Sequence, residues 1–265
     1  MRMDSRMSIQ SSKSQRGFSL VELSIVILIM GLLLGGIALP LAQQRDNARL
    51  NEAERQVEDV REALEGYLLV NGALPCPATP ASGGRAAVAG GSCQRQHGFV
   101  PATTLDLRGH RNDDNLLLDP WKSPLRYSVT ATDVDANGDW DFVNPADLRA
   151  VGIAALTPDL VVCRTAAGAS GIACGAANAT LTDSSPFLVY SFGKDWAQFS
   201  SADQLENAGA TLGGGPSGAS YRVAANSVFV LRGLSAQSGN EFDDVLAWTP
   251  ATTVYKRLVD AGFVP

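Results

Sequence analysis

Histidine is scarce in this sequence of 265 residues, which contains only His97 and His110. Neither lies in a recognisable nucleophile motif, although His110 stands near Asp113 and Asp114 in "GHRNDDN". The glycine clusters also lack the Lys-Ser/Thr pair that follows the glycines of a phosphate-binding loop. The sequence therefore predicts a protein that is not an enzyme, with a hydrolase kept as an alternative.

An excess of positive charge is missing as well. The formal net charge is −6, and the first 17 residues carry a net +3, which leaves −9 on the remainder. Proteins that bind nucleic acid present clustered Lys and Arg to the phosphates. The acidic body therefore argues against nucleic acid as a partner.

Charge of either sign is absent between Leu23 and Leu39, and apolar residues continue to Ala42. The run approaches the roughly 20 residues that span the hydrocarbon core of a bilayer. Basic residues ahead of it would keep the N-terminus in the cytoplasm. Glu22 stands at its edge, where an ionised side chain costs roughly 2.5–3.5 kcal/mol in lipid. A secretory signal peptide or a simple membrane anchor would explain the run but not Glu22.

The stretch "RGFSLVE", from Arg16 to Glu22, resembles the cleavage and methylation motif of type IV prepilins and type II secretion pseudopilins. The resemblance implies that prepilin peptidase cuts between Gly17 and Phe18 and methylates the new amine of Phe18. It also implies that Glu22 pairs with the N-terminal amine of a neighbouring subunit during assembly. Such a partner would offset the cost of a carboxylate in lipid.

This resemblance divides the chain into a leader peptide at 1–17, a long helix at 18–72 and a globular α+β domain at 73–265. Residues 18–42 are expected to cross the inner membrane, with the N-terminus cytoplasmic and the C-terminal domain periplasmic. They would later form the core of a periplasmic or cell-surface filament. The implied partners are other pilin or pseudopilin subunits, prepilin peptidase and an inner-membrane assembly platform.

Residues 43–72 are predicted to form an amphipathic helix that ends near Asn71-Gly72. Its apolar stripe suits either packing on a sheet or a coiled-coil seam, and the short length after Pro40 favours packing. The stripe comprises Leu50, Ala53, Val57, Val60, Leu64 and Tyr67, and the charged face comprises Arg45, Asp46, Arg49, Glu52, Arg55, Glu58, Glu62 and Glu65.

Beyond Ala73, short apolar runs alternate with Gly- and Ser-rich stretches, which predicts strands joined by loops. The expected fold is α+β and type IV pilin-like, with the long N-terminal helix packed on an antiparallel β-sheet. The segments "DPWKSPLRYSV", "LVYSFGKDW" and "FDDVLAW" resemble stretches of the major pseudopilin of type II secretion. The predicted elements are strands at Leu125–Ala131, Leu160–Arg164, Phe187–Phe192, Ser227–Leu231 and Val245–Trp248, a terminal helix at Val254–Ala261, and loops at 82–92, 166–175 and 207–220.

Cysteine is limited to four residues without the tight pairs of a zinc site. An even number beyond a membrane segment favours two local disulfides, Cys76–Cys93 and Cys163–Cys174, over free thiols or crossed connectivities.

Two acidic groups are candidate calcium sites. In "DVDANGDWD" oxygen-bearing side chains occupy alternate positions, and Gly138 stands where a calcium loop turns sharply. The twelfth position is Asn144 instead of glutamate, so an Asn-Gly hairpin joining Leu125–Ala131 to Trp140–Val143 is the alternative. The resemblance to the major pseudopilin implies a second group of candidate calcium ligands. The candidate ligands are Asp133, Asp135, Asn137, Asp139 and Asp141 in the first group, and Asp195, Asp243 and Asp244 in the second.

The sequence thus predicts a structural subunit, a minor pilin or pseudopilin of a type IV pilus or type II secretion filament. No cofactor is required, and calcium is the one candidate ion. The alternative is a surface adhesin or DNA-uptake pilin that contacts a ligand through its Gly- and Ser-rich loops.

Overall fold

The structure, a computed structural model, describes residues 17–209 and 226–264, except for the side chains of residues 34–42. The chain divides into two compact units, Met1–Asn47 and Ala48–Pro265. The helices are α1 (Leu20–Asn71), α2 (Pro145–Val151), α3 (Ala202–Ala208) and α4 (Ala251–Asp260), with short 3-10 helices at Pro80–Ser82 and Ala177–Ala179. The strands are β1 (Val88–Ala89), β2 (Ser92–Cys93), β3 (His97–Phe99), β4 (Arg126–Val129), β5 (Leu160–Cys163), β6 (Thr180–Ser185), β7 (Phe187–Ser191), β8 (Val228–Val230) and β9 (Val245–Trp248).

Helix α1 begins two residues later than Phe18, the predicted start. Ser19 precedes it, and its Oγ accepts a hydrogen bond from the backbone N–H of Val21 at 3.3 Å, which satisfies a free donor of the first turn. The helix ends where Asn71-Gly72 predicted. Gly72 adopts a φ of +70°, and a Cβ there would clash with the ring of Phe263. Glycine therefore provides both the left-handed turn and the space for the close approach.

The apolar stripe of α1 is buried inside the second unit. Ala53, Val57, Val60 and Leu64 are at most 1% exposed and share one core with β4, β7 and α4. This confirms packing within the chain over a coiled-coil seam. The prediction of an exposed charged face is wrong at Glu65, whose side chain is 1% exposed. Its ion pairs with Arg61 and Arg257 compensate for the burial of its charge.

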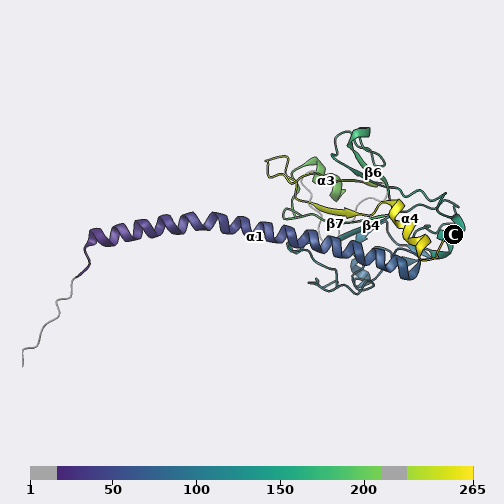
Figure 1. Cartoon of the computed structure of the whole chain (residues 1–265), viewed down its shortest axis with the longest axis horizontal. Coiled ribbons are helices and arrows are strands. Elements are labelled where there is room, and N and C mark those ends of the chain that lie inside the picture. Colours follow the sequence, from purple (N-terminus) through teal and green to yellow (C-terminus); the bar gives the residue numbers. More distant parts are fainter. Residues whose placement is uncertain (1–16, 210–225, 265) are drawn as a thin grey trace, which may run out of the picture. The chain divides into compact units, whose positions relative to one another are not determined.

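A four-stranded antiparallel sheet with the order β3-β4-β7-β9 packs against the part of α1 that belongs to the second unit. Alternate residues of its strands face opposite layers. On β7, Phe187 and Val189 join the core with α1, whereas Leu188 and Tyr190 join a second core with β5, β8 and α3. Because both faces are covered, β7 reads as an unbroken buried run, "FLVYS". In Figure 1, α4 lies beside the C-terminal part of α1, and its Val254 and Leu258 belong to the same core as α1, β4 and β7.

A second sheet of three strands has the order β6-β5-β8. Strands β5 and β6 are antiparallel, but β5 and β8 are parallel, with Val161 opposite Val228. The predicted α+β class is confirmed, and this parallel pair departs from the expected antiparallel sheet. The body therefore has three layers: helix, four-stranded sheet and three-stranded sheet.

The predicted hairpin between Leu125–Ala131 and Trp140–Val143 is wrong. Strand β4 already pairs with β3 on one side and with β7 on the other, so it has no free edge. Residues 140–143 form a turn that leads into α2 instead. The loop at 133–139 is therefore an excursion from the sheet and not the tip of a two-stranded ribbon.

Both local disulfides are present, with Cα–Cα distances of 5.2 Å for Cys76–Cys93 and 5.7 Å for Cys163–Cys174. All five predicted strands exist within one or two residues of their expected ends. The terminal helix starts at Ala251, earlier than predicted. The expected loop at 82–92 contains β1, and most of the loop at 207–220 lies outside the described residues. Strands β2, β3 and β6 and helices α2 and α3 were not predicted.

Candidate functional site

The N-terminal motif stands at the start of α1. Gly17 and Phe18 precede the helix, and Phe18 is 85% exposed. Glu22 lies in the first helical turn and is exposed, and within the described part of the chain its carboxylate has no ion-pair partner. The scissile bond implied by the resemblance is thus outside the helix, and the carboxylate is available to a group from another molecule.

Among the described residues, no helical stretch is long and apolar enough to cross a membrane. The predicted span at 18–42 includes residues 34–42, whose side chains lie outside the description.

A group of three carboxylates, which we call the 195/243/244 cluster, lies where two neighbouring strands meet. Asp195 follows β7, and Asp243 and Asp244 come directly before β9. Ser191 at the end of β7 pairs with Val245 at the start of β9, so the two segments converge although many residues separate them. Carboxylate oxygens of all three residues lie within 4.8 Å of one another.

Amide donors hold this cluster in place. The side-chain amide of Gln204 donates to both oxygens of Asp195 at 2.9 Å and to Asp243 at 3.1 Å. The backbone N–H of Lys194 donates to Asp243 at 2.6 Å, and Asn207 donates to Oδ2 of Asp244 at 2.6 Å. These donors are neutral, so they orient the carboxylates without removing their mutual repulsion.

The protonation of the cluster reflects this crowding. Burial, followed by the neighbouring Asp195, raises the pKa of Asp243 to about 7. Burial also raises the pKa of Asp244 well above its usual range, with smaller contributions from Asp243 and Asp195. Asp244 is 3% exposed, and its Oδ1 has no hydrogen-bond partner among the described residues. A buried, unpaired carboxylate oxygen beside two like charges suits a bound cation.

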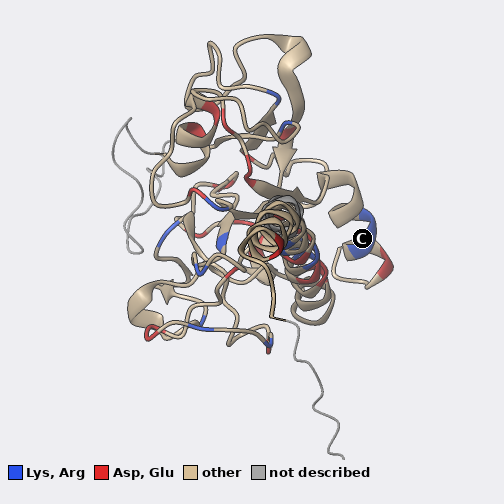
Figure 2. Cartoon of the chain, turned by 90° about the vertical axis from the view of Figure 1, so that its left-hand side faces the viewer, with Lys and Arg blue, Asp and Glu red and all other residues tan. Residues whose placement is uncertain are grey.

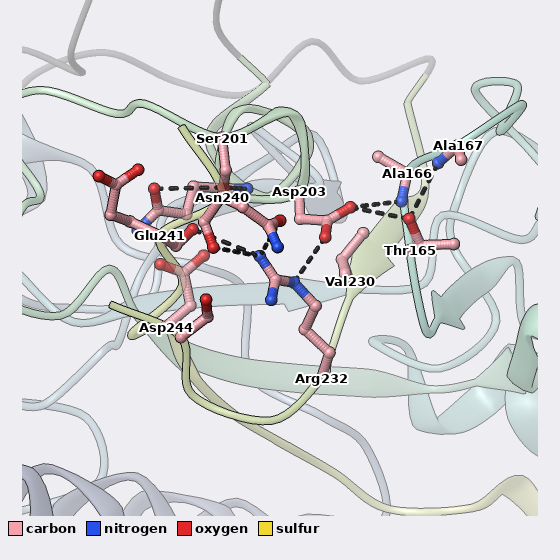
Figure 3. Close-up of polar contacts among 12 residues, drawn as sticks. Thr165, Ala166, Ala167, Ser201, Asp203, Val230, Arg232, Asn240, Glu241 and Asp244 are labelled. Atoms are coloured by element: carbon pink, nitrogen blue, oxygen red, sulfur yellow. Dashed lines mark hydrogen bonds and ion pairs between the residues drawn. The ribbon is translucent and has the colours of Figure 1, made fainter. Parts of the chain in front are cut away.

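Arg232 is the basic side chain that moderates the pKa of Asp244. Figure 3 shows it between Asp203 and the segment that contains Asn240 and Glu241, with Asp244 alongside. Its Nε forms an ion pair with Asp203 at 2.6 Å, and its Nη2 donates to the backbone oxygen of Asn240 at 3.1 Å. Because Asp203 already compensates its charge, Arg232 leaves the cluster with an excess of negative charge.

Asn207 links the cluster to the second sheet. Its side chain donates to the backbone oxygen of Val230 at 2.9 Å and accepts from the N–H of Val230 at 2.7 Å. It therefore pairs with β8 much as a neighbouring strand would, while it also holds Asp244. Sequence reasoning missed Gln204, Asn207 and Arg232. The spacing of Gln204 and Asn207, three residues apart behind the helix-capping Ser201, was the one local signal.

The second acidic candidate is only partly assembled. Carboxylate oxygens of Asp133, Asp135 and Asp141 lie within 4.8 Å of one another, but Asp139 is outside this group and accepts a hydrogen bond from Asn144 at 3.1 Å. Asn144 also caps α2 by accepting from the N–H of Ala146. The twelfth residue of the expected calcium loop is thus engaged elsewhere.

The two histidines are in different surroundings. His97 is buried in β3, and its Nδ1 is 2.8 Å from the hydroxyl of Ser128. His110 is exposed in a loop, as are Asp113 and Asp114. Acidic and basic residues are otherwise interspersed over the ribbon, and both occur along α1 and α4 (Figure 2).

Comparison with known proteins identifies one feature. The family model of the prokaryotic N-terminal methylation motif matches residues 12–38, which include Gly17, Phe18 and Glu22. This match supports membership of the class of type IV pilins and pseudopilins, in agreement with the α+β body and its long N-terminal helix. No curated protein and no solved structure matches the chain.

Proposed function

We propose that the chain is a structural subunit, a minor pilin or pseudopilin, of a type IV pilus or type II secretion filament. The observation that carries this proposal is the methylation motif at 12–38, with Gly17 and Phe18 ahead of α1 and Glu22 in its first turn. Prepilin peptidase would cleave after Gly17 and methylate Phe18. The exposed position of these two residues ahead of the helix supports access by a peptidase.

In this proposal residues 18–42 hold the subunit in the inner membrane before assembly, with the basic leader in the cytoplasm and the body in the periplasm. Assembly then brings the amine of Phe18 of one subunit to Glu22 of another. The side chains of the segment from Phe18 to Leu33 support a role in such contacts, because the large apolar residues there are 43–86% exposed.

The mature N-terminus tests the proposal. Mass spectrometry of the chain from a host with prepilin peptidase is expected to show a first residue of N-methylated Phe18. A Gly17→Val variant is expected to keep the leader, because the branched side chain occupies the residue next to the scissile bond. The matched control is Ser19→Val, two residues further on. Detection of wild-type mature protein with any other first residue would contradict the proposal.

We also propose that the 195/243/244 cluster holds calcium, as the resemblance to the major pseudopilin implies. Calcium binds oxygen ligands, and three carboxylates with the unpartnered Oδ1 of Asp244 fit a hard divalent cation. Bound calcium would hold the segment that follows β7 to the segment that precedes β9. Through Asn207 it would also hold these segments to the edge of β8. Its role is then to stabilise the body of the subunit.

Calcium is expected to raise the melting temperature, and to do so more near pH 8 than near pH 5. Saturation at about 100 times the dissociation constant adds about 2.7 kcal/mol, or roughly 5–10 °C for a body of this size. The pKa of Asp243 is about 7, so protons compete with the cation at lower pH. In chelator the same raised pKa means that the folded state holds more protons than the unfolded state, so stability declines as pH rises from about 4 to 7.

Asp243→Asn separates this site from other effects of calcium. The variant removes one of three repelling charges, so near pH 8 in chelator we expect it to melt higher than the wild type. Calcium should also raise the melting temperature of this variant less than that of the wild type. The control is Asp183→Asn, since the side chain of Asp183 is exposed on β6, and it should show the full calcium-induced rise in melting temperature. A full calcium-induced rise in Asp243→Asn would exclude calcium from this cluster.

A further inference from the structure

The acidic loop, residues Asp133–Asp141 between β4 and α2, concentrates negative charge without a basic partner. Oxygens of Asp133, Asp135 and Asp141 lie within 4.8 Å of one another. Asp133 accepts from the backbone N–H of Asn137 at 3.1 Å and from that of Gly138 at 2.9 Å. Asp135 accepts from the backbone and side-chain amides of Asn137. Within the described residues no Lys or Arg contacts these three carboxylates, so three like charges remain uncompensated.

A second observation points to a ligand. Asp141 is 0% exposed, and its Oδ2 accepts from the backbone N–H of Val134 at 3.1 Å. Its other oxygen, Oδ1, is buried without a hydrogen-bond partner in the described part of the chain. Burial raises the pKa of Asp141, and Asp135, Asp133 and Asp147 of α2 raise it further. A carboxylate in this position is stable when ionised only if a cation compensates it.

We propose that the acidic loop binds a calcium ion through the carboxylates of Asp133, Asp135 and Asp141. The candidate ligand atoms are all oxygens, and the described cysteines are in disulfides, so zinc is disfavoured. The three aspartates stand at the first, third and ninth positions of a calcium-type loop, and Gly138, with a φ of +98°, stands at the sixth.

The missing twelfth ligand sets the expected strength of this site. Asn144 is committed to α2 and to Asp139, so water must complete the six to eight oxygens that calcium takes. The dissociation constant is then expected on the order of 10⁻⁴ M, as in extracellular calcium modules. Magnesium would bind more weakly, because it requires a regular octahedral arrangement.

Binding here would order a different region from the 195/243/244 cluster. The N–H of Trp140 donates to the hydroxyl of Ser92 in β2 at 3.3 Å, and Asp139 lies against Gly91. The neighbouring Cys93 is bonded to Cys76. The N–H of Leu74 donates to the backbone oxygen of Phe142 at 2.7 Å. Calcium would therefore fix the acidic loop against the β1–β2 hairpin and the segment that follows α1.

Calcium counting on the full chain in detergent tests the inference. After removal of metal by a chelator, equilibrium dialysis against calcium should show one ion fewer in Asp135→Asn and in Asp141→Asn than in the wild type. Asp183→Asn, an exposed aspartate with the same change in charge, should keep the wild-type number. Asp135 is itself exposed, so this variant is expected to fold even if the buried change at Asp141 does not.

Terbium alone, used as a luminescent substitute for calcium, locates the ion. Trp140 belongs to the acidic loop, and Trp140→Phe should remove the part of the tryptophan-sensitised emission that Asp135→Asn also removes. Asp243→Asn should leave that part intact, which separates this site from the cluster proposed above. Unchanged calcium numbers in both loop variants, or terbium emission insensitive to Trp140→Phe, would overturn the inference. Processing at Phe18 is measured separately and bears on the proposed function alone.

Discussion

Replacing Glu65 with alanine is expected to lower the free energy of unfolding by about 3 kcal/mol, because removal of one partner breaks a buried network of ion pairs. Glu65 is 1% exposed on α1. Its Oε1 contacts Arg61 and accepts from the hydroxyl of Thr249 at 2.6 Å, and its Oε2 contacts Arg257 at 2.6 Å. These contacts join α1 to α4 and to the residue that follows β9.

The measurement is equilibrium denaturation followed by tryptophan fluorescence. Glu54→Ala is the matched control, because Glu54 is exposed on the same helix and alanine is favourable in helices. We expect the control to differ from the wild type by less than about 0.5 kcal/mol. Glu65→Gln should fall between the two, since the amide keeps the shape but loses the charge. Equal stability of Glu65→Ala and Glu54→Ala would show that the network contributes nothing net.

Glu22→Ala is expected to abolish incorporation into filaments, or to reduce it at least about tenfold, a loss that corresponds to about 1.4 kcal/mol. Truncating one side of a desolvated charge pair usually costs more, about 2–5 kcal/mol. The lost partner is the amine that cleavage creates on Phe18 of a neighbouring subunit. Cleavage itself should persist, because the scissile bond lies outside α1 and away from Glu22 in sequence.

Sheared filaments and membranes, probed for the subunit, give the measurement. Glu22→Asp should retain part of the incorporation because it keeps the charge, whereas Glu22→Gln should behave like alanine. Ser24→Ala is the control, since the hydroxyl of Ser24 bonds to the backbone oxygen of Val21 within the same helix. Wild-type incorporation of Glu22→Gln would remove the proposed ion pair from assembly.

The sequence predicted those elements whose formation depends on residues close together in the chain. The stripe through Ala53 and Val57 identified the buried face of α1, and the unbroken apolar run from Phe187 identified β7. Asn71-Gly72 marked the end of α1 because the left-handed turn there needs glycine.

Features that depend on contacts between residues far apart in the chain could not be predicted from these local patterns. Glu65 resembles its exposed neighbours in sequence, and two of the groups that make its burial tolerable, Thr249 and Arg257, lie far along the chain. The parallel pairing of β5 with β8 leaves no mark in either strand. The resemblance to the pseudopilin predicted that Asp195 and Asp243 lie in one group. It did not predict the side-chain amides of Gln204 and Asn207 that orient the cluster, because the helix that carries them, α3, was not predicted.

The parallel pair also sets the order in which the body can be completed. Strand β5 is enclosed by β6 early, but its other edge stays open until Val228, much later in the chain, arrives beside Val161. Closing such a long loop is slow compared with forming a hairpin. During that interval β5 exposes an apolar edge that another chain could extend. Strand β8 therefore completes the hydrogen bonding of β5, and until it pairs, the newly made subunit presents an edge that is open to aggregation.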